Sequence, residues 1–123
     1  MESSKHPFDI TSWLSRSLID QLGNIGAEAG RAIQAKENND LLRFEWAFFR
    51  MDELFRATIS DRALRHTRRL HEVLRAREVT YSFLDGQNEY HETPASLERY
   101  WMEWGILANM ERKRIREEKN ISI

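Results

Sequence analysis

Cysteine is absent from the sequence, which also holds only two prolines and five glycines among its 123 residues. Without cysteine, disulfide bonds, thiolate metal sites and cysteine nucleophiles are excluded, and we expect a reducing, cytoplasmic environment. So few helix-breaking residues favour long helices joined by short connections. The sequence therefore predicts an all-α protein.

Long hydrophobic runs and an excess of one charge are missing as well. No stretch approaches the ~18 uninterrupted apolar residues of a membrane span, and residues 1–10 carry charges where a signal peptide would be apolar. The 19 basic residues are balanced by 20 acidic ones, so the whole chain has no strong attraction to nucleic acid or to anionic membranes. We expect neither a membrane span nor a secretion signal.

The length and the pattern of apolar residues predict one domain of four helices. We expect a flexible arm over residues 1–10, a helical bundle over residues 11–110, and a charged helical extension or tail over residues 111–123. Long helices joined by short turns run antiparallel to their neighbours, so an up-down-up-down four-helix bundle is expected. The predicted helices cover residues 11–36, 40–59, 62–84 and 94–110.

Short polar side chains mark the helix boundaries, because their oxygens accept hydrogen bonds from free backbone N–H groups at a helix start. Glycine marks one helix end, since it adopts the left-handed conformation that a helix C-terminus favours. The expected start signals are Asp9 or Thr11, Asn39 or Asp40, Ser60-Asp61, and Thr93 followed by Pro94, and the expected end signal is Asp85-Gly86.

Apolar residues recur every three or four positions, the spacing that lines one face of a helix. In the first helix Gly23, Gly26 and Gly30 lie beside this stripe. Each glycine lowers the stability of the helix by about 1 kcal/mol relative to Ala. Close approach of a second helix or of another chain would compensate for that loss. The expected inward residues are Leu14, Leu18, Leu22, Ile25, Ala29 and Ile33; Phe44, Phe48, Met51, Phe55 and Ile59; Ala63, Leu70, Leu74, Tyr81 and Leu84; and Leu97, Trp101, Trp104 and Ala108.

The charged residues close to these stripes are the candidate site. On the third predicted helix Arg77 shares the apolar stripe, so its charge must reach solvent or find a partner. Polar residues of the first and third helices could meet in an interhelical pocket, as a structural network or as a binding site. The candidate binding residues are Glu28, Arg31, His71, Glu72, Arg75, Glu78, Asn88, Glu89 and Tyr90.

Metal and cofactor motifs are not found. His66 and His71 are five residues apart, which places them poorly for shared ligation, and the sequence has neither Glu-x-x-His nor His-Glu-x-x-His. Glycine-rich phosphate loops and serine nucleophile elbows are also missing from the sequence. We expect no metal and no cofactor, and the catalytic residues, if there are any, are not identified.

A basic segment leaves a nucleic-acid hypothesis open. Arg65 and His71 match the Arg-to-His spacing of helical RNases of the HEPN class, although the Tyr usual soon after that His is missing here. Neighbouring arginines could hold RNA phosphates, or could form a salt-bridged exposed face. These arginines are Arg62, Arg65, Arg68 and Arg69.

Three short patterns of mostly polar residues occur in the sequence: NIG-x-E-x-x-RA at residues 24–32, E-x-x-R-x-RE at residues 72–78, and G-x-NEY at residues 86–90. These patterns resemble those of a family of short, uncharacterised prokaryotic all-helical proteins. The resemblance covers about residues 12–109 and implies a compact helical fold, but it names no activity, substrate or cofactor. Gln87 departs from the Asp expected beside Gly86 in such a pattern.

The function expected from the sequence is a non-enzymatic interaction or scaffold module that acts as a homo-oligomer, most simply a homodimer. Four Trp and six Phe provide ample apolar area for a contact with a second chain. Trp46 and Phe49 lie off the predicted inward stripe of their helix. The alternative is a helical-bundle enzyme or ligand-binding protein with an interhelical polar site, including an RNA-binding protein or RNase.

Overall fold

The computed structural model describes residues 8–121, so residues 1–7 of the predicted arm and residues 122–123 of the predicted tail lie outside the described range. This range contains helices and no strand, which confirms the all-α class. The elements are α1 (Ile10–Leu14), α2 (Leu18–Glu37), α3 (Leu41–Ile59), a 3-10 helix η2 (Arg62–Leu64), α4 (Arg68–Leu84) and α5 (Pro94–Ile121).

The first predicted helix is interrupted at residues 15–17, so one continuous helix was the wrong expectation. Ser17 has an extended backbone, and its hydroxyl oxygen accepts a hydrogen bond from the backbone N–H of Asp20 at 3.0 Å. Because this bond satisfies a free N–H group, Ser17 begins a new helix. The cap at Asp9 is confirmed, since its carboxylate accepts from the backbone N–H of Ser12.

The third predicted helix begins later than expected. Ser60 ends α3, Asp61 caps only η2, and Thr67 caps α4. Between η2 and α4, His66 has a φ of 62°, a left-handed conformation that a right-handed helix cannot contain. The predicted helix start at residue 62 is therefore wrong.

Three other predicted boundaries are confirmed. Asp40 caps α3 through the backbone N–H of Arg43. Gly86 follows α4 with a φ of 96°, and the hydroxyl of Thr93 accepts from the backbone N–H of Ser96 at 3.0 Å where α5 begins. These boundaries were predictable because each depends on a local bond or a local backbone conformation.

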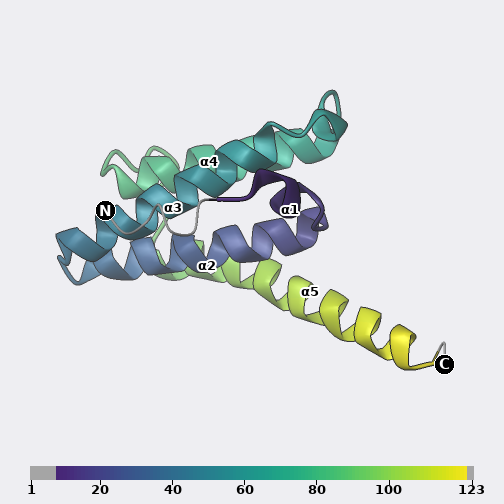
Figure 1. Ribbon diagram of the computed structural model, residues 1–123. Coiled ribbons are helices and arrows are strands. Elements are labelled where there is room, and N and C mark those ends of the chain that lie inside the picture. Colours follow the sequence, from purple (N-terminus) through teal and green to yellow (C-terminus); the bar gives the residue numbers. More distant parts are fainter. Residues whose placement is uncertain (1–7, 122–123) are drawn as a thin grey trace.

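The helix α2 makes its main contacts with α5 and α3 (Figure 1). Two glycines of α2 allow α5 to approach closely: an added Cβ at Gly23 would lie 2.8 Å from the Cβ of Ala108, and one at Gly26 would lie 3.0 Å from the ring of Trp101. The predicted close approach of a second helix is confirmed at these two residues. At Gly30 an added Cβ would meet nothing within 4 Å.

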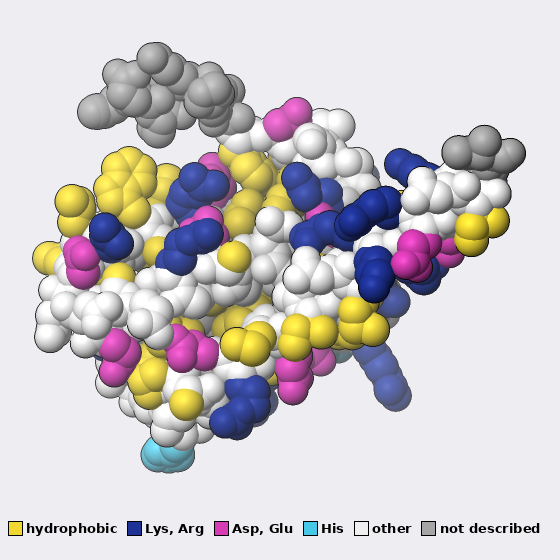
Figure 2. Space-filling model, turned by 90° about the horizontal axis from the view of Figure 1, so that it is seen from below, with side chains coloured by type: hydrophobic (Ala, Val, Ile, Leu, Met, Phe, Trp, Pro, Cys, Tyr) yellow, Lys and Arg dark blue, Asp and Glu magenta, His cyan; other side chains and the backbone are white. Residues whose placement is uncertain are grey.

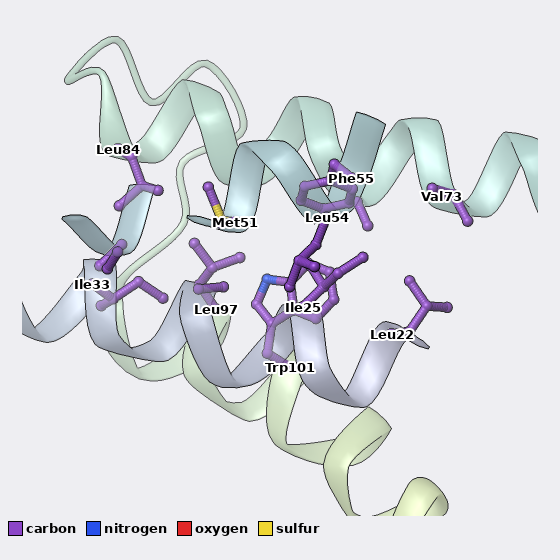
Figure 3. Close-up of a cluster of buried hydrophobic side chains, with 14 of the residues drawn as sticks. Leu22, Ile25, Ile33, Met51, Leu54, Phe55, Val73, Leu84, Leu97 and Trp101 are labelled. Carbon is purple, nitrogen blue, oxygen red and sulfur yellow. The ribbon is translucent and has the colours of Figure 1, made fainter. Parts of the chain in front are cut away.

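The core forms where α2, α3, α4 and α5 meet (Figure 3). The ring of Phe55 lies 5.9 Å from that of Trp101 in an edge-on contact, a favourable arrangement for two aromatic rings. Most predicted inward residues are buried or half-buried. The buried residues of the core include Leu22, Ile25, Ala29, Ile33, Met51, Leu54, Phe55, Val73, Leu84, Leu97 and Trp101.

The buried face of α4 differs from the prediction. Val73, Ala76 and Thr80 are buried, whereas Leu74 is 40% exposed and Ala63, in η2, is exposed. The inward stripe of α4 thus runs through smaller side chains than the leucines chosen from the sequence. Thr80 is accepted in the core because its hydroxyl oxygen accepts a hydrogen bond from the indole N–H of Trp101 at 3.0 Å.

Candidate functional site

The predicted polar residues of α2 form ion pairs on the side where α2 faces α3. The carboxylate of Glu28 lies 3.1 Å from the guanidinium of Arg31, one turn away on the same helix, and 3.9 Å from that of Arg50 on α3. Both arginines are well exposed. Solvent therefore screens these charges, and each pair contributes little to stability.

The predicted polar residues of α4 contact the loop after α4 and the helix α5. The hydroxyl of Tyr90 donates a hydrogen bond to Glu78 at 2.6 Å, and the guanidinium of Arg75 lies 4.9 Å from the centre of the same ring. The hydroxyl of Tyr100 on α5 donates to Glu72 at 2.8 Å. These three α4 residues thus connect α4 to the segment that follows it.

Two of these tyrosines have raised pKa values. Burial, followed by the hydrogen bond to Glu72, raises the pKa of Tyr100 to about 12, although a side-chain contact with Trp104 acts in the opposite direction. The hydrogen bond to Glu78 is the largest cause of the raised pKa of Tyr90. Both side chains therefore stay neutral donors at physiological pH.

The remaining predicted site residues lie in the loop after α4 and on the surface of α4. The side chain of Asn88 donates to the backbone C=O of Glu92 and accepts from its N–H, both at 2.9 Å. The backbone N–H of Glu89 donates to the hydroxyl of Ser82 at 2.8 Å. These bonds fix the loop, and His71 is exposed on the outer surface of α4.

The predicted site residues consequently form two groups with different partners. Glu28 and Arg31 pair on α2 and α3, whereas Glu72, Arg75 and Glu78 pair with the loop and with α5. Within residues 8–121 no hydrogen bond or ion pair joins the first group to the second. The structure does not bring them into the single network expected between the first and third helices.

Sequence reasoning missed the most completely paired carboxylate, Asp20. Its oxygens accept from Arg16 at 2.8 Å and from Arg112 on α5 at 2.6 and 3.0 Å, and the residue is only 8% exposed. Burial acts to raise the pKa of Asp20, but the bonds and charges of Arg16 and Arg112 outweigh it and lower that pKa. Nothing in the sequence around Asp20 indicates that residue 112 is its partner.

A second missed feature is a buried chain of hydrogen bonds between α1, α3 and α2. The indole N–H of Trp13 donates to the hydroxyl of Thr58 at 2.9 Å, and that hydroxyl donates to the side-chain oxygen of Gln21 at 2.7 Å. Each of these polar atoms is satisfied inside the core. The three helices are thereby held in one relative position.

The charge of Arg77, which was expected to need a partner, has one on its own helix, α4. Its guanidinium lies 4.9 Å from the ring centre of Tyr81, a favourable cation–π distance. The hydroxyl of Tyr81 donates to Asp52 on α3 at 2.6 Å, while the Nε atom of Arg77 is buried without a hydrogen bond to any described residue. Burial and Asp52 together raise the pKa of Tyr81.

An open groove of about 840 Å³ lies along the contact between α2 and α5. Its surface is formed partly by Gly30 and Gly105, where an added Cβ would meet nothing within 4 Å, and by the side chains of Met102 and Ile106. Arg31 also lines it. This groove is mainly apolar.

Most of the exposed large apolar side chains lie on α3 and α5. On α3 they form the α3 surface, defined here as Leu42, Trp46 and Phe49, which are 66%, 59% and 66% exposed. On α5 the exposed apolar residues include Met102, Ile106 and Met110. In Figure 2 the face seen from below carries two groups of hydrophobic side chains, one of them in a row toward the C-terminal end.

Neither a metal site nor a membrane span is found in the described residues. Residues 8–121 contain no group of three or more His, Asp or Glu side chains placed to hold a metal ion. None of the helices in this range is both long and apolar enough to cross a bilayer.

Comparison with protein-family models, with characterised proteins and with solved structures finds no match to this chain.

Proposed function

We propose that this protein is a non-enzymatic interaction module that acts as a homo-oligomer. The observation that carries the proposal is the exposure of large apolar side chains on α3 and α5, with Trp46 and Phe49 more than half exposed. Aromatic side chains dominate the energetics of protein interfaces, and contiguous exposed apolar groups mark such surfaces. A second copy of the chain would cover one of these two surfaces.

The pairing of the predicted polar residues supports a non-enzymatic role. Glu72, Arg75 and Glu78 each contact an aromatic side chain of the following segment. These contacts stabilise the position of the loop and of α5. The proposed framework is an up-down-up-down antiparallel bundle of α2, α3, α4 and α5, as expected for long helices joined by short turns.

The mass of the protein in solution tests this proposal. Size-exclusion chromatography with light scattering should give the mass of an oligomer at micromolar concentrations, and a fraction of monomer that grows on dilution. A monomer mass at every concentration up to the high micromolar range contradicts the proposal. Variants of the α3 surface, such as Trp46→Ala with Phe49→Ala, then show whether this surface takes part.

A second candidate function, RNA binding, has one observation in its favour. Arg62, Arg65, Arg68 and Arg69 are all exposed where η2 meets α4, and exposed arginines can hold phosphates. Fluorescence anisotropy with a short labelled RNA tests this function. Binding that weakens with salt and with Arg68→Glu supports it, and cleavage lost in Arg65→Ala or His71→Ala would indicate an RNase.

A further inference from the structure

The outer face of α5 carries a regular pattern of exposed residues, named here the α5 surface. Its members lie four, three, four, three and four positions apart, so they form one stripe along the helix. All of them are exposed. The α5 surface consists of Arg99, Glu103, Ile106, Met110, Lys113 and Glu117.

This stripe is turned away from the buried contacts of α5, although Ile106 also lines the groove beside α2. The opposite face of α5 holds Leu97, Trp101 and Ala108, which are buried. None of the four charged residues of the α5 surface forms an ion pair with another described residue. Their charges are therefore available to a neighbouring molecule.

The last turns of α5 extend beyond the rest of the fold. Arg112 pairs with Asp20 near the start of α2, and after this pair α5 continues to Ile121, past the other helices (Figure 1). At 1.5 Å per residue, nine residues project by about 13 Å. Lys113 and Glu117 belong to this projection, so a neighbouring molecule can reach them.

We infer that two copies of the chain associate through their α5 surfaces, with the two α5 helices antiparallel and centred near Ala108. This inference rests on the proposed function and specifies its interface. In this register Ile106 of each copy faces Met110 of the other. Around this apolar centre Glu103 faces Lys113, and every contact occurs twice because the two copies are related by a two-fold axis.

Charge complementarity determines the direction of pairing. In the antiparallel register Glu103 faces Lys113, and Arg99 faces Glu117, so all four charged positions have opposite partners. In a parallel pair each residue would face its own copy, and like charges in contact are destabilising. The order of charges along α5 thus favours only the antiparallel dimer.

The size of this interface indicates a dimer that depends on concentration. The stripe from residue 99 to residue 117 is about 27 Å long, and a contact of two single helices is small among stable interfaces. The apolar centre provides the attraction, and the exposed charge pairs weaken as salt is added. We expect dissociation on dilution and in high salt.

A charge-swap series tests the inference. Glu103→Lys places two lysines in contact, and Lys113→Glu places two glutamates in contact. Each change should raise the dimer dissociation constant about tenfold, since both symmetric pairs are reversed. The double variant Glu103→Lys with Lys113→Glu restores both attractions, so its dissociation constant should return close to that of the wild type.

A matched control and a second measurement complete the test. Arg116→Glu reverses a charge on an exposed position of α5 outside the stripe, and should leave the dissociation constant unchanged. Because the chain has no cysteine, Ile106→Cys and Met110→Cys can be introduced separately. Under mild oxidation a mixture of these two variants should form the mixed disulfide in preference to disulfides within either variant.

The outcomes separate this inference from the proposed function. If the wild type is an oligomer but the single charge changes have no effect, or the double variant is as weak as the single ones, the α5 pairing is overturned while the proposed function stands. If the wild type is a monomer at every concentration, both are overturned. Circular dichroism of each variant verifies that the surface changes leave the fold intact.

Discussion

Replacing Asp20 by Asn tests whether the Asp20 pairs hold α5 against α2. The amide keeps the size of the side chain and removes its charge, so the bonds from Arg16 and Arg112 lose their ionic character. Breaking hydrogen bonds to a charged group costs about 1.5–3 kcal/mol. The two arginine side chains are 46% and 47% exposed and can be solvated, so we expect a loss of about 2 kcal/mol in unfolding free energy.

The assay is thermal and urea unfolding followed by circular dichroism. For a domain of this size, about 2 kcal/mol corresponds to a fall of about 8 °C in Tm. The matched control is Glu118→Gln, which removes a carboxylate from the more exposed pair with Arg114 and should change the unfolding free energy by less than about 0.5 kcal/mol. Equal, small effects of the two variants would refute this account of Asp20.

The pH dependence gives an independent test of Asp20. Its pKa in the folded protein is lowered from the ordinary value of 3.8, so its charged form stabilises the fold above that value. As the pH falls through the lowered pKa, the carboxylate is protonated and this stabilisation is lost. The difference between wild type and Asp20→Asn should therefore shrink below about pH 4, and a difference independent of pH would contradict the ionic explanation.

Three further predictions concern stability. Gly23→Ala should lower the unfolding free energy by about 1–3 kcal/mol, because the new Cβ would lie 2.8 Å from a side chain of α5; Gly30→Ala, with open space around its Cβ, should raise it by about 0.5–1 kcal/mol. Thr58→Val should cost about 2–3 kcal/mol, since it leaves two buried polar groups without partners. Glu78→Ala should cost less than about 1 kcal/mol, because its bond to Tyr90 is exposed. Urea unfolding measures all four variants, and a loss of several kcal/mol for Glu78→Ala, or the same sign for the two glycine variants, would contradict these assignments.

The sequence predicts the helices better than their interruptions. Asp40, Gly86 and Thr93 act through bonds or dihedral angles within a few residues, so their patterns are sufficient. The break before α2 had a local signal as well, since Ser17 is followed three residues later by an acidic residue, which is typical of a helix start. The left-handed conformation of His66 has a weaker signal, because non-glycine residues seldom adopt it and His is only one of the types enriched there.

The candidate site was less predictable, because periodicity places residues on a helix face without fixing which helix covers that face. Glu28 and Glu78 both lie close to the apolar stripes of their helices, yet they pair with different elements. The partner of Asp20 is 92 residues away in sequence. The spacing of residues along one helix does not predict a partner so far away in sequence. The glycines of α2 did predict a close neighbouring helix, and this helix is α5.

The contact at Gly23 and Gly26 sets the direction in which the projecting end of α5 points. Because glycine has no side chain, the backbones of α2 and α5 come close together near Ala108. The angle between the two helices is set at this contact. The end of α5 at Ile121 lies about 20 Å beyond Ala108. A side chain added at Gly23 or Gly26 would change the angle between α2 and α5, and the resulting displacement of α5 would increase with distance from the contact. The absence of two side chains in α2 thus determines where the end of α5 lies.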